Sequence, residues 1–343
     1  MITQTELDKA KEFGFYEARA INLKRPKTGR HFSKWIEKDM HGDMEWLKRD
    51  EDRRLHPEKI LPGAKTIISL IVSYRIEETV DEKVSDPSCG VIARYALADD
   101  YHKVLTKKVK EYIRYLESRI ENLKSKFYID TGPILERDFA RESGHGFIGK
   151  NTNLINPQIG SFVFLIEIIC DAKLENESRN EIKESCGGCT MCLTNCPTGA
   201  IIKDREIDAR KCLAYLTIEW KGEILEEFRK QMKNRIFGCD ICQEVCPWNK
   251  KLTGSTMPEF VVRKEFLTPK LNDLAKLSEE EFLEMTKKSP VRRAGYEGFL
   301  RNVMIALGNW GDKEALLGIA IGLKHKSKLV RHHAQWAEKQ LMI

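Results

Sequence analysis

The sequence of 343 residues predicts an α/β domain, then a cysteine-rich module, then an α-helical tail. Three observations lead to this division. Strand-length apolar runs and one long amphipathic segment occupy the first half of the chain. Eight of the ten cysteines lie between residues 186 and 246, and apolar residues recur at helical spacing after residue 261. We therefore expect three domains, at residues 1–175, 176–260 and 261–343.

Strands of the first domain are predicted from short apolar runs. Glu167 interrupts the run that begins at Phe162. No run approaches the ~18 apolar residues of a membrane span, so we expect no membrane partner. The predicted strands are residues 65–74, 91–97, 127–129 and 161–169.

Helices of the first domain are predicted from caps and periodicity. Thr5 can cap a first helix that runs towards Phe13. Asp99 or Asp100 can cap a long helix, because apolar residues recur at three- and four-residue steps up to Leu123. Residues 130–133, Asp-Thr-Gly-Pro, are typical of a strand-to-helix turn with proline at the first helical position.

The cysteine spacings favour two iron–sulfur clusters. The first group of cysteines, residues 186–196, has the bacterial ferredoxin spacing C-x2-C-x2-C-x3-C-P, in which the fourth cysteine ligates the other cluster. The second group, residues 239–246, supplies only three cysteines, and Cys212 is the one nearby candidate for a fourth ligand. A crossed assignment follows. One [4Fe-4S] cluster is assigned Cys186, Cys189, Cys192 and Cys246, and the other Cys196, Cys212, Cys239 and Cys242.

Two other uses of these cysteines fit less well. Zinc also binds C-x2-C pairs, but four cysteines spaced C-x2-C-x2-C-x3-C and followed by proline are not a zinc-ribbon pattern. Disulfides are disfavoured because the N-terminal residues show no apolar signal segment, so we expect a cytoplasmic protein with reduced thiols. Cys170 is predicted to be a buried apolar residue, and Cys89 receives no role.

Charge and the tail bear on partners. The net charge of +6, from 58 basic and 52 acidic residues, permits a nucleic-acid partner without establishing one. Segments 300–307, 316–323 and 329–341 resemble one and a half HEAT-like repeats, too few to stand alone, so the tail should dock on the rest. Its basic residues are either a tRNA surface or an ordinary solvated face: Arg292, Arg293, Arg301, Lys324, Lys326, Lys328 and Arg331.

Several stretches together resemble the epoxyqueuosine reductase family. They are D-T-G-P-I-L-E-R at 130–137, A-R-E-S-G-H-G-F-I-G-K-N at 140–151, G-S-F-V-F-L at 160–165 and the two cysteine groups. The resemblance covers essentially the whole chain in order. The G-x-G-x-x-G at 144–149 follows an expected helix end, not a strand, so we do not interpret it as a dinucleotide site.

The resemblance implies a nitroreductase-like domain that holds cobalamin, as cob(II)alamin, in place of flavin. The substrate would be the anticodon stem-loop of tRNA with epoxyqueuosine at the wobble position, and the product queuosine. A low-potential donor would supply electrons to a monomeric enzyme. Asp130 matches the family's proton donor, although Asp-Thr-Gly-Pro alone favours a turn residue.

The resemblance also implies cofactor contacts. His102 is expected at the pocket or a helix terminus, not on cobalt, because no D-x-H-x-x-G motif is present. The residues matched to the cofactor pocket are Arg54, Ala93, Tyr95, Tyr101, His102, Lys150 and Asn151.

Three other functions remain open from the sequence. A ferredoxin-like carrier would not need the long first domain. A reductase of small molecules, like the reductive dehalogenases, would typically carry a twin-arginine signal, which is absent here. A cobalamin-trafficking or nucleic-acid-binding protein with structural clusters is the third.

Overall fold

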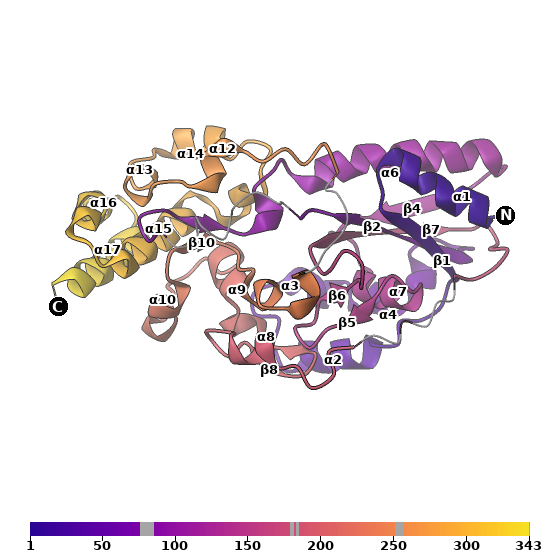
Figure 1. Ribbon diagram of the computed structural model, residues 1–343, viewed down its shortest axis with the longest axis horizontal. Helices are drawn as coiled ribbons and strands as arrows, with labels where there is room; N and C mark the ends of the chain where they lie inside the picture. Colours follow the sequence, from indigo (N-terminus) through magenta and orange to yellow (C-terminus); the bar gives the residue numbers. More distant parts are fainter. Residues whose placement is uncertain (76–85, 179–181, 183–184, 251–256, 343) are drawn as a thin grey trace.

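The structure is a computed structural model and describes residues 1–75, 86–178, 182, 185–250 and 257–342. The two ends of the chain lie at opposite ends of an elongated molecule (Figure 1). The sheet of the first domain lies near the N-terminal end, and the tail helices lie near the C-terminal end. Residues 179–181 and 183–184, near the start of the cysteine-rich module, are outside the described residues.

A four-stranded antiparallel sheet forms the centre of the first domain. Its order is β1 (Glu17–Asn22), β2 (Thr66–Ser73), β7 (Val163–Cys170) and β4 (Ser125–Tyr128). Every residue of β2 is buried, as expected for an apolar strand covered on both faces. The predicted strands at 65–74, 127–129 and 161–169 are confirmed within about two residues at each end, the usual precision of such boundaries.

The helix α6 (Tyr101–Arg119) covers one face of this sheet (Figure 1). Its Leu105, Val109 and Leu116 pack in one core with strand residues that include Ile68 and Ile168. Asp100, one of the two predicted caps, accepts the His102 backbone N–H at 3.1 Å. The long-helix prediction is therefore confirmed, with Asp100 rather than Asp99 as the cap.

The first helix differs from its prediction. α1 (Gln4–Asp8) begins after Thr3, not Thr5, because Thr3 and Glu6 form the reciprocal capping box. The Thr3 N–H donates to the Glu6 carboxylate at 3.1 Å. After Asp8 the chain continues as a 3-10 turn, η1 (Lys9–Phe13), so the predicted end near Phe13 is confirmed.

The first domain also contains several short elements, of which the helix at Glu136–Glu142 packs on β2 and β7 at the other face of the sheet. They are α2 (Gly29–Glu37), α3 (Glu45–Arg49), α4 (Glu51–Leu55), η2 (Pro57–Lys59), α7 (Glu136–Glu142), β5 (Phe147–Ile148) and β6 (Leu154–Ile155). The predicted turn into a helix at Pro133 is wrong. α7 begins three residues later, at Glu136, because residues 130–134 fold into a separate bend first.

The segment 91–97 was predicted as a strand of the first domain, and this is wrong. Only β3 (Val91–Ile92) is extended, and η3 (Arg94–Ala96) follows. β3 pairs in parallel with β10 (Arg235–Phe237) of the cysteine-rich module instead of joining the four-stranded sheet. The Ala93 N–H donates to the Phe237 carbonyl at 2.8 Å, so this segment connects the first domain to the module.

The cysteine-rich module has little regular structure. Its elements are α8 (Met191–Thr194), β8 (Ile201–Lys203), β9 (Glu206–Ile207), η4 (Ala209–Lys211), α9 (Leu213–Ile218), α10 (Glu226–Met232), β10, α11 (Ile241–Glu244) and η5 (Pro247–Asn249). Metal bonds can supply the folding free energy that such short elements lack.

The tail is helical, as predicted. It comprises α12 (Lys264–Leu267), α13 (Leu271–Leu274), α14 (Glu279–Met285), η6 (Pro290–Ala294), α15 (Tyr296–Trp310), η7 (Lys313–Ala315), α16 (Leu316–Leu323) and α17 (Lys328–Leu341). α15 is buried along most of its length, because it packs against α16, α17 and β10. One core joins the tail, the module and residues of segment 92–97, so the predicted docking of the tail is observed. Among the described residues, no helix has the length and apolar character needed to cross a membrane.

Candidate active site and metal centres

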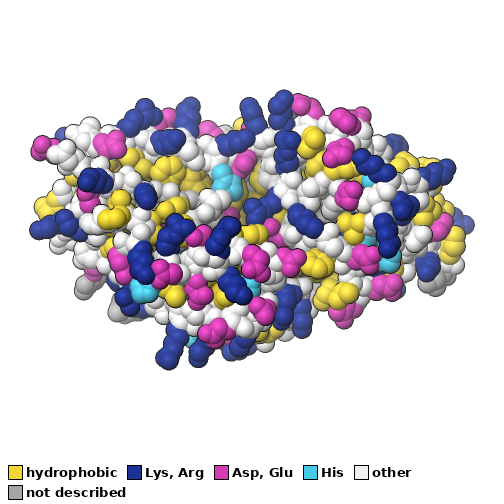
Figure 2. All heavy atoms as spheres, turned by 180° about the vertical axis from the view of Figure 1, so that it is seen from behind, with side chains coloured by type: hydrophobic (Ala, Val, Ile, Leu, Met, Phe, Trp, Pro, Cys, Tyr) yellow, Lys and Arg dark blue, Asp and Glu magenta, His cyan; other side chains and the backbone are white. Residues whose placement is uncertain are grey.

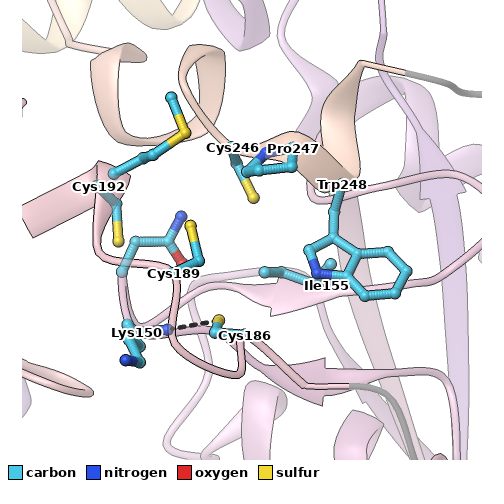
Figure 3. Close-up of a pocket in the computed structure, with 10 residues that line it drawn as sticks. Lys150, Ile155, Cys186, Cys189, Cys192, Cys246, Pro247 and Trp248 are labelled. Atoms are coloured by element: carbon cyan, nitrogen blue, oxygen red, sulfur yellow. Dashed lines mark hydrogen bonds between the residues drawn. The ribbon is translucent and has the colours of Figure 1, made fainter.

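Four cysteines line one pocket at the surface of the module, and we call them the outer quartet: Cys186, Cys189, Cys192 and Cys246. Figure 3 shows their sulfurs turned towards a shared space. The Lys150 backbone N–H donates to the Cys186 sulfur at 3.4 Å, and Asn151 and Trp248 complete the wall. The fourth member, Cys246, comes from the second group of cysteines in the sequence.

The remaining four cysteines of the stretch, which we call the inner quartet, are Cys196, Cys212, Cys239 and Cys242. Burial is the largest cause that raises the pKa of the Cys239 thiol, to about 12, and the charge of Cys212 adds to it. The pKa of Cys242 is also raised by burial, and it responds to all three other members. The thiols of Cys212, Cys239 and Cys242 are therefore buried beside one another, although each residue as a whole is partly exposed.

The donor sets fit iron–sulfur clusters. Each quartet offers four thiols, and among the residues that the structure describes no histidine or carboxylate lines the outer pocket. Among the two cysteines outside the quartets, Cys170 is buried in the core of the sheet, as predicted. Cys89 is buried beside Asp86, and its Sγ donates a hydrogen bond to the Asp86 carboxylate Oδ2 at 3.3 Å.

Residues 150–151 join the two quartets. The Asn151 side-chain amide donates to the Cys242 carbonyl at 3.2 Å, while Lys150 contacts Cys186. Both were predicted beside cobalamin, and that contact stays a prediction. A further anchor could not be predicted from the residue pattern. Ser161, just before β7, donates its backbone N–H to Asn249 at 2.8 Å and its hydroxyl to Gln243 of the module at 2.9 Å.

Asp130 lies in a tight turn at the end of β4. Its φ is +59°, and the Thr131 N–H donates to the Ile129 carbonyl at 2.7 Å, which closes a three-residue turn. A Cβ on Gly132 would lie 2.2 Å from the Tyr128 ring, so only glycine lets the loop fold back on the strand. Non-glycine residues with positive φ are costly and gather at functional sites.

The Asp130 carboxylate accepts a hydrogen bond of 2.5 Å from the Tyr101 hydroxyl. Tyr101 opens α6, and its ring stacks on Phe164 with a centroid distance of 4.1 Å and an interplanar angle of 10°. Burial and the negative charge of Asp130 raise the pKa of Tyr101, so the phenol stays neutral and donates. Asp130 is exposed as a residue, but the Tyr101 hydroxyl holds its carboxylate at one position.

Unpartnered buried atoms surround this aspartate. Arg54 is 7% exposed and donates from one guanidinium nitrogen to the Ile134 carbonyl at 3.1 Å. Its Nε has no partner among the described residues, and neither do His102 Nε2 and Glu136 Oε1. Buried polar atoms without a hydrogen-bond partner are rare in folded proteins. They fit a polar cofactor periphery, such as the amides of a corrin ring.

The predicted cofactor residues Ala93 and Tyr95 lie between Asp130 and the inner quartet. A Cβ on Gly238, the residue before Cys239, would lie 2.5 Å from the Ala93 Cβ, so the two chains touch there. Tyr95 is packed between Tyr101 and Phe237, with centroid distances of 6.1 and 6.2 Å. Tyr101, Tyr95 and Ala93 thus form a continuous wall from Asp130 to the residue before Cys239 of the inner quartet.

The basic residues of the tail do not share one environment. Arg301 is fully buried and donates to the carbonyls of Leu216, Trp220 and Gly222 at 2.7–2.8 Å. Both predicted alternatives for Arg301, a tRNA surface and a solvated face, are therefore wrong, because the guanidinium ties α15 to α9 and the following loop. Lys324, Lys326 and Lys328 are exposed. Lysines and arginines also spread over the whole face in Figure 2, with acidic side chains between them.

Comparison with known proteins agrees with this arrangement. A 4Fe-4S double cluster binding domain matches residues 185–249, and the family described as epoxyqueuosine reductase QueG, DUF1730, matches residues 54–131. The epoxyqueuosine reductase of Escherichia coli K12 is 37% identical over 330 residues, which cover 96% of this chain and 86% of that protein.

Solved structures are similar over nearly the whole chain. An epoxyqueuosine reductase with a tRNA-Tyr epoxyqueuosine-modified stem loop has a TM-score of 0.88 and 29% identity, covering 98% of this chain and 89% of that one. The Bacillus subtilis enzyme, with an aspartate-bearing catalytic loop swung out of its active site, has a TM-score of 0.87 at 29% identity and coverage of 98% and 90%.

The fold and the two quartets define a double-cluster iron–sulfur protein whose module is joined to an α/β domain. Relatives more than 30% identical cover almost all of the chain. The chain belongs to the epoxyqueuosine reductase family.

Proposed function

We propose that this chain reduces epoxyqueuosine to queuosine at the wobble position of tRNA. The observation that carries the proposal is the carboxylate of Asp130, held by Tyr101 beside a wall shared with the inner cysteines. An acid next to an electron path suits a reduction that must also protonate a departing oxygen. The relatives named above are epoxyqueuosine reductases, and one was solved with an epoxyqueuosine-modified stem loop.

The two quartets would hold two [4Fe-4S] clusters in the crossed assignment. The outer one would be Cys186, Cys189, Cys192 and Cys246, and the inner one Cys196, Cys212, Cys239 and Cys242. The outer quartet borders exposed residues such as Met191, whereas the inner quartet adjoins Ala93 through Gly238, the residue before Cys239. Electrons from a low-potential donor would therefore enter at the outer quartet and leave from the inner one.

Cobalamin is the proposed cofactor between the inner quartet and Asp130. When bound, it would supply strongly reducing cobalt chemistry. Arg54 Nε and His102 Nε2, the unpartnered buried atoms, would bond its polar periphery. Ala93, Tyr95 and Tyr101 would form an apolar wall that excludes water, and Lys150 with Asn151 would lie at the edge nearest the cysteines. The domain that holds it would be nitroreductase-like.

Asp130 would donate a proton to the oxygen that leaves carbon. The Tyr101 hydrogen bond orients the carboxyl group, and the positive φ points it away from the strand that ends there. General acid catalysis of this kind contributes roughly 10²–10⁴-fold to a rate. The aspartate-bearing catalytic loop of the Bacillus subtilis enzyme supports the same role here.

The tRNA would contact exposed basic residues of the tail and module. Arg292, Lys324, Lys326 and Lys328 are exposed, and phosphate contacts of this kind need only charge and reach. We further propose a monomer in the cytoplasm, where the cluster thiols stay reduced before assembly.

One experiment tests the proposal. The protein is reconstituted anaerobically with iron, sulfide and cobalamin, and iron and cobalt are measured per chain. It is then incubated with epoxyqueuosine tRNA and a strong reductant, and the nucleosides are analysed. Queuosine formation with about eight irons supports the proposal. Cluster assembly without cobalamin binding or queuosine would favour an electron carrier instead.

A further inference from the structure

Two glutamates on the α7 side of the sheet each have a buried carboxyl oxygen without a partner among the described residues. Glu167 is fully buried in β7, where it interrupts an otherwise apolar strand. Ser69 donates to its Oε1 at 2.8 Å, and its Oε2 has no partner among the described residues. Glu136, the first residue of α7, likewise has a buried Oε1 without a partner. Uncompensated carboxylates are expensive inside a protein, so both groups should be neutral.

The fold sets these acids in a row that ends at Asp130. β4 pairs with β7 so that Tyr128 stands opposite Glu167, and Asp130 follows two residues later. α7 packs across β7, and its first turn carries Glu136. Asp130 and Glu136 are electrostatically coupled, and so are Glu136 and Glu167. The row therefore runs from the exposed loop, through Glu136, to the inside of the sheet.

The charged groups that face Glu136 do not cancel its burial. Burial raises the pKa of Glu136, and the negative charge of Asp130 raises it further. Arg54 and Arg137 act in the opposite direction, more weakly. Arg54 already donates to the Ile134 carbonyl, and Arg137 to the Thr152 carbonyl at 2.7 Å. Neither arginine forms an ion pair with Glu136 among the described residues.

The chemistry of the proposed reaction needs two protons. An epoxide takes up two electrons and two protons to give an alkene and water. Opening the first C–O bond places one proton on the oxygen. Breaking the second C–O bond releases that oxygen as water and consumes the other proton. Asp130 can carry only one proton at a time, and a bound cofactor and nucleoside would shield it from solvent.

We propose that Glu136 stores the second proton and passes it to Asp130 within a single turnover. This inference rests on the proposed function. Glu167 would assist this role of Glu136. Because Glu167 is neutral, it adds no negative charge that would bind the proton of Glu136 more tightly. Ser69 keeps Glu167 in place from β2. Glu136 thus acts through Asp130 and need not touch the substrate.

The first test uses Glu136→Gln under single-turnover conditions, which keeps the shape of the side chain and removes its acidic proton. We expect queuosine formation to slow by roughly 10–10²-fold, with both clusters and tRNA binding retained. A small weak acid added to the buffer should restore part of the rate. In the wild type the rate should fall as pH rises and Glu136 ionises, and this limb should be absent in the variant. Wild-type rates and an unchanged pH profile in Glu136→Gln would overturn the proposal.

The matched control is Glu142→Gln, at the other end of the same helix. Glu142 is ionised beside Lys24 and Lys27, at 3.1 and 2.7 Å, so it stores no proton. It should leave the rate and the pH profile unchanged, and an equal loss of rate in both variants would point to α7 stability instead.

A second test needs no turnover and no variant that might misfold. Infrared spectra of the wild-type protein with isotope-labelled glutamate should show neutral glutamate carboxyl groups near neutral pH, one of which ionises on alkaline titration. Their absence would overturn the proposal even if queuosine forms. Their presence with no queuosine from any variant would instead count against the proposed function.

Discussion

Replacing Asp130 with asparagine separates proton donation from turn formation. The residue has a φ of +59°, a region that asparagine and aspartate tolerate better than other side chains. The asparagine amide can still accept a hydrogen bond from Tyr101, so the loop should keep its shape. What the variant loses is the acidic proton.

The expected magnitudes differ for stability and for catalysis. A hydrogen bond to a charged group contributes about 1.5–3 kcal/mol and a neutral one about 0.5–1.5 kcal/mol, so the variant should lose only about 1 kcal/mol of unfolding free energy. Loss of a general acid should slow turnover by roughly 10²-fold or more, which corresponds to about 2.7 kcal/mol of activation free energy.

The assay is queuosine formation in a single turnover, with iron, cobalt and tRNA affinity measured on the same preparation. Tyr101→Phe is the partner variant, because it keeps the ring stacked on Phe164 and removes only the hydroxyl that orients Asp130. It should slow the reaction less than Asp130→Asn. A near-wild-type rate for Asp130→Asn, with both clusters present, would refute the proton-donor role.

Three further predictions test the clusters, the tRNA surface and the docking of the tail. Cys212→Ser should remove the inner cluster and leave about four irons per chain, and iron analysis with both clusters retained would exclude Cys212 as a ligand. Changing Lys324, Lys326 and Lys328 together to alanine should weaken tRNA binding and reduce the slope of log affinity against log salt by up to about 3; an unchanged slope would place the tRNA elsewhere. His333, on α17, accepts the Ile224 N–H at 3.2 Å, and burial lowers its pKa to about 3, so it is neutral in the fold. Because the unfolded chain binds a proton that the folded chain does not, stability should fall by about 2–3 kcal/mol between about pH 7 and 4.5. Urea unfolding should show a smaller pH dependence in His333→Gln, and an equal dependence would exclude His333 as the cause.

Local signals were sufficient where each element could be identified from its own residues. The strand at Thr66–Ser73 and the helix at Tyr101–Arg119 follow from apolar periodicity. The cysteine spacing itself indicated clusters, since ligands three positions apart, such as Cys186, Cys189 and Cys192, can reach one metal centre. Asp130 and the pocket residues came from the resemblance to a family, not from the pattern of the residues.

Other features depend on contacts between distant parts of the chain. Segment 91–97 has strand propensity, but it pairs with β10 of the module rather than with the sheet. Arginine is usually a surface residue, but Arg301 is buried, where it donates hydrogen bonds to backbone carbonyls in and after α9. The interruption of β7 by Glu167 was visible in the sequence, and its alignment with Tyr128 and the first turn of α7 was not.

The sequence by itself determined the cluster chemistry, the main strands and the long helix, because periodicity and ligand spacing are local properties of the chain. Only the tertiary structure decided which polar groups are buried and what they face. It set Asp130 against Tyr101, joined Ala93 to the residue before Cys239, and aligned Glu136 and Glu167 behind the turn. The physical reason is that burial and electrostatic coupling depend on distances between residues that are far apart in sequence, and no local pattern encodes those distances.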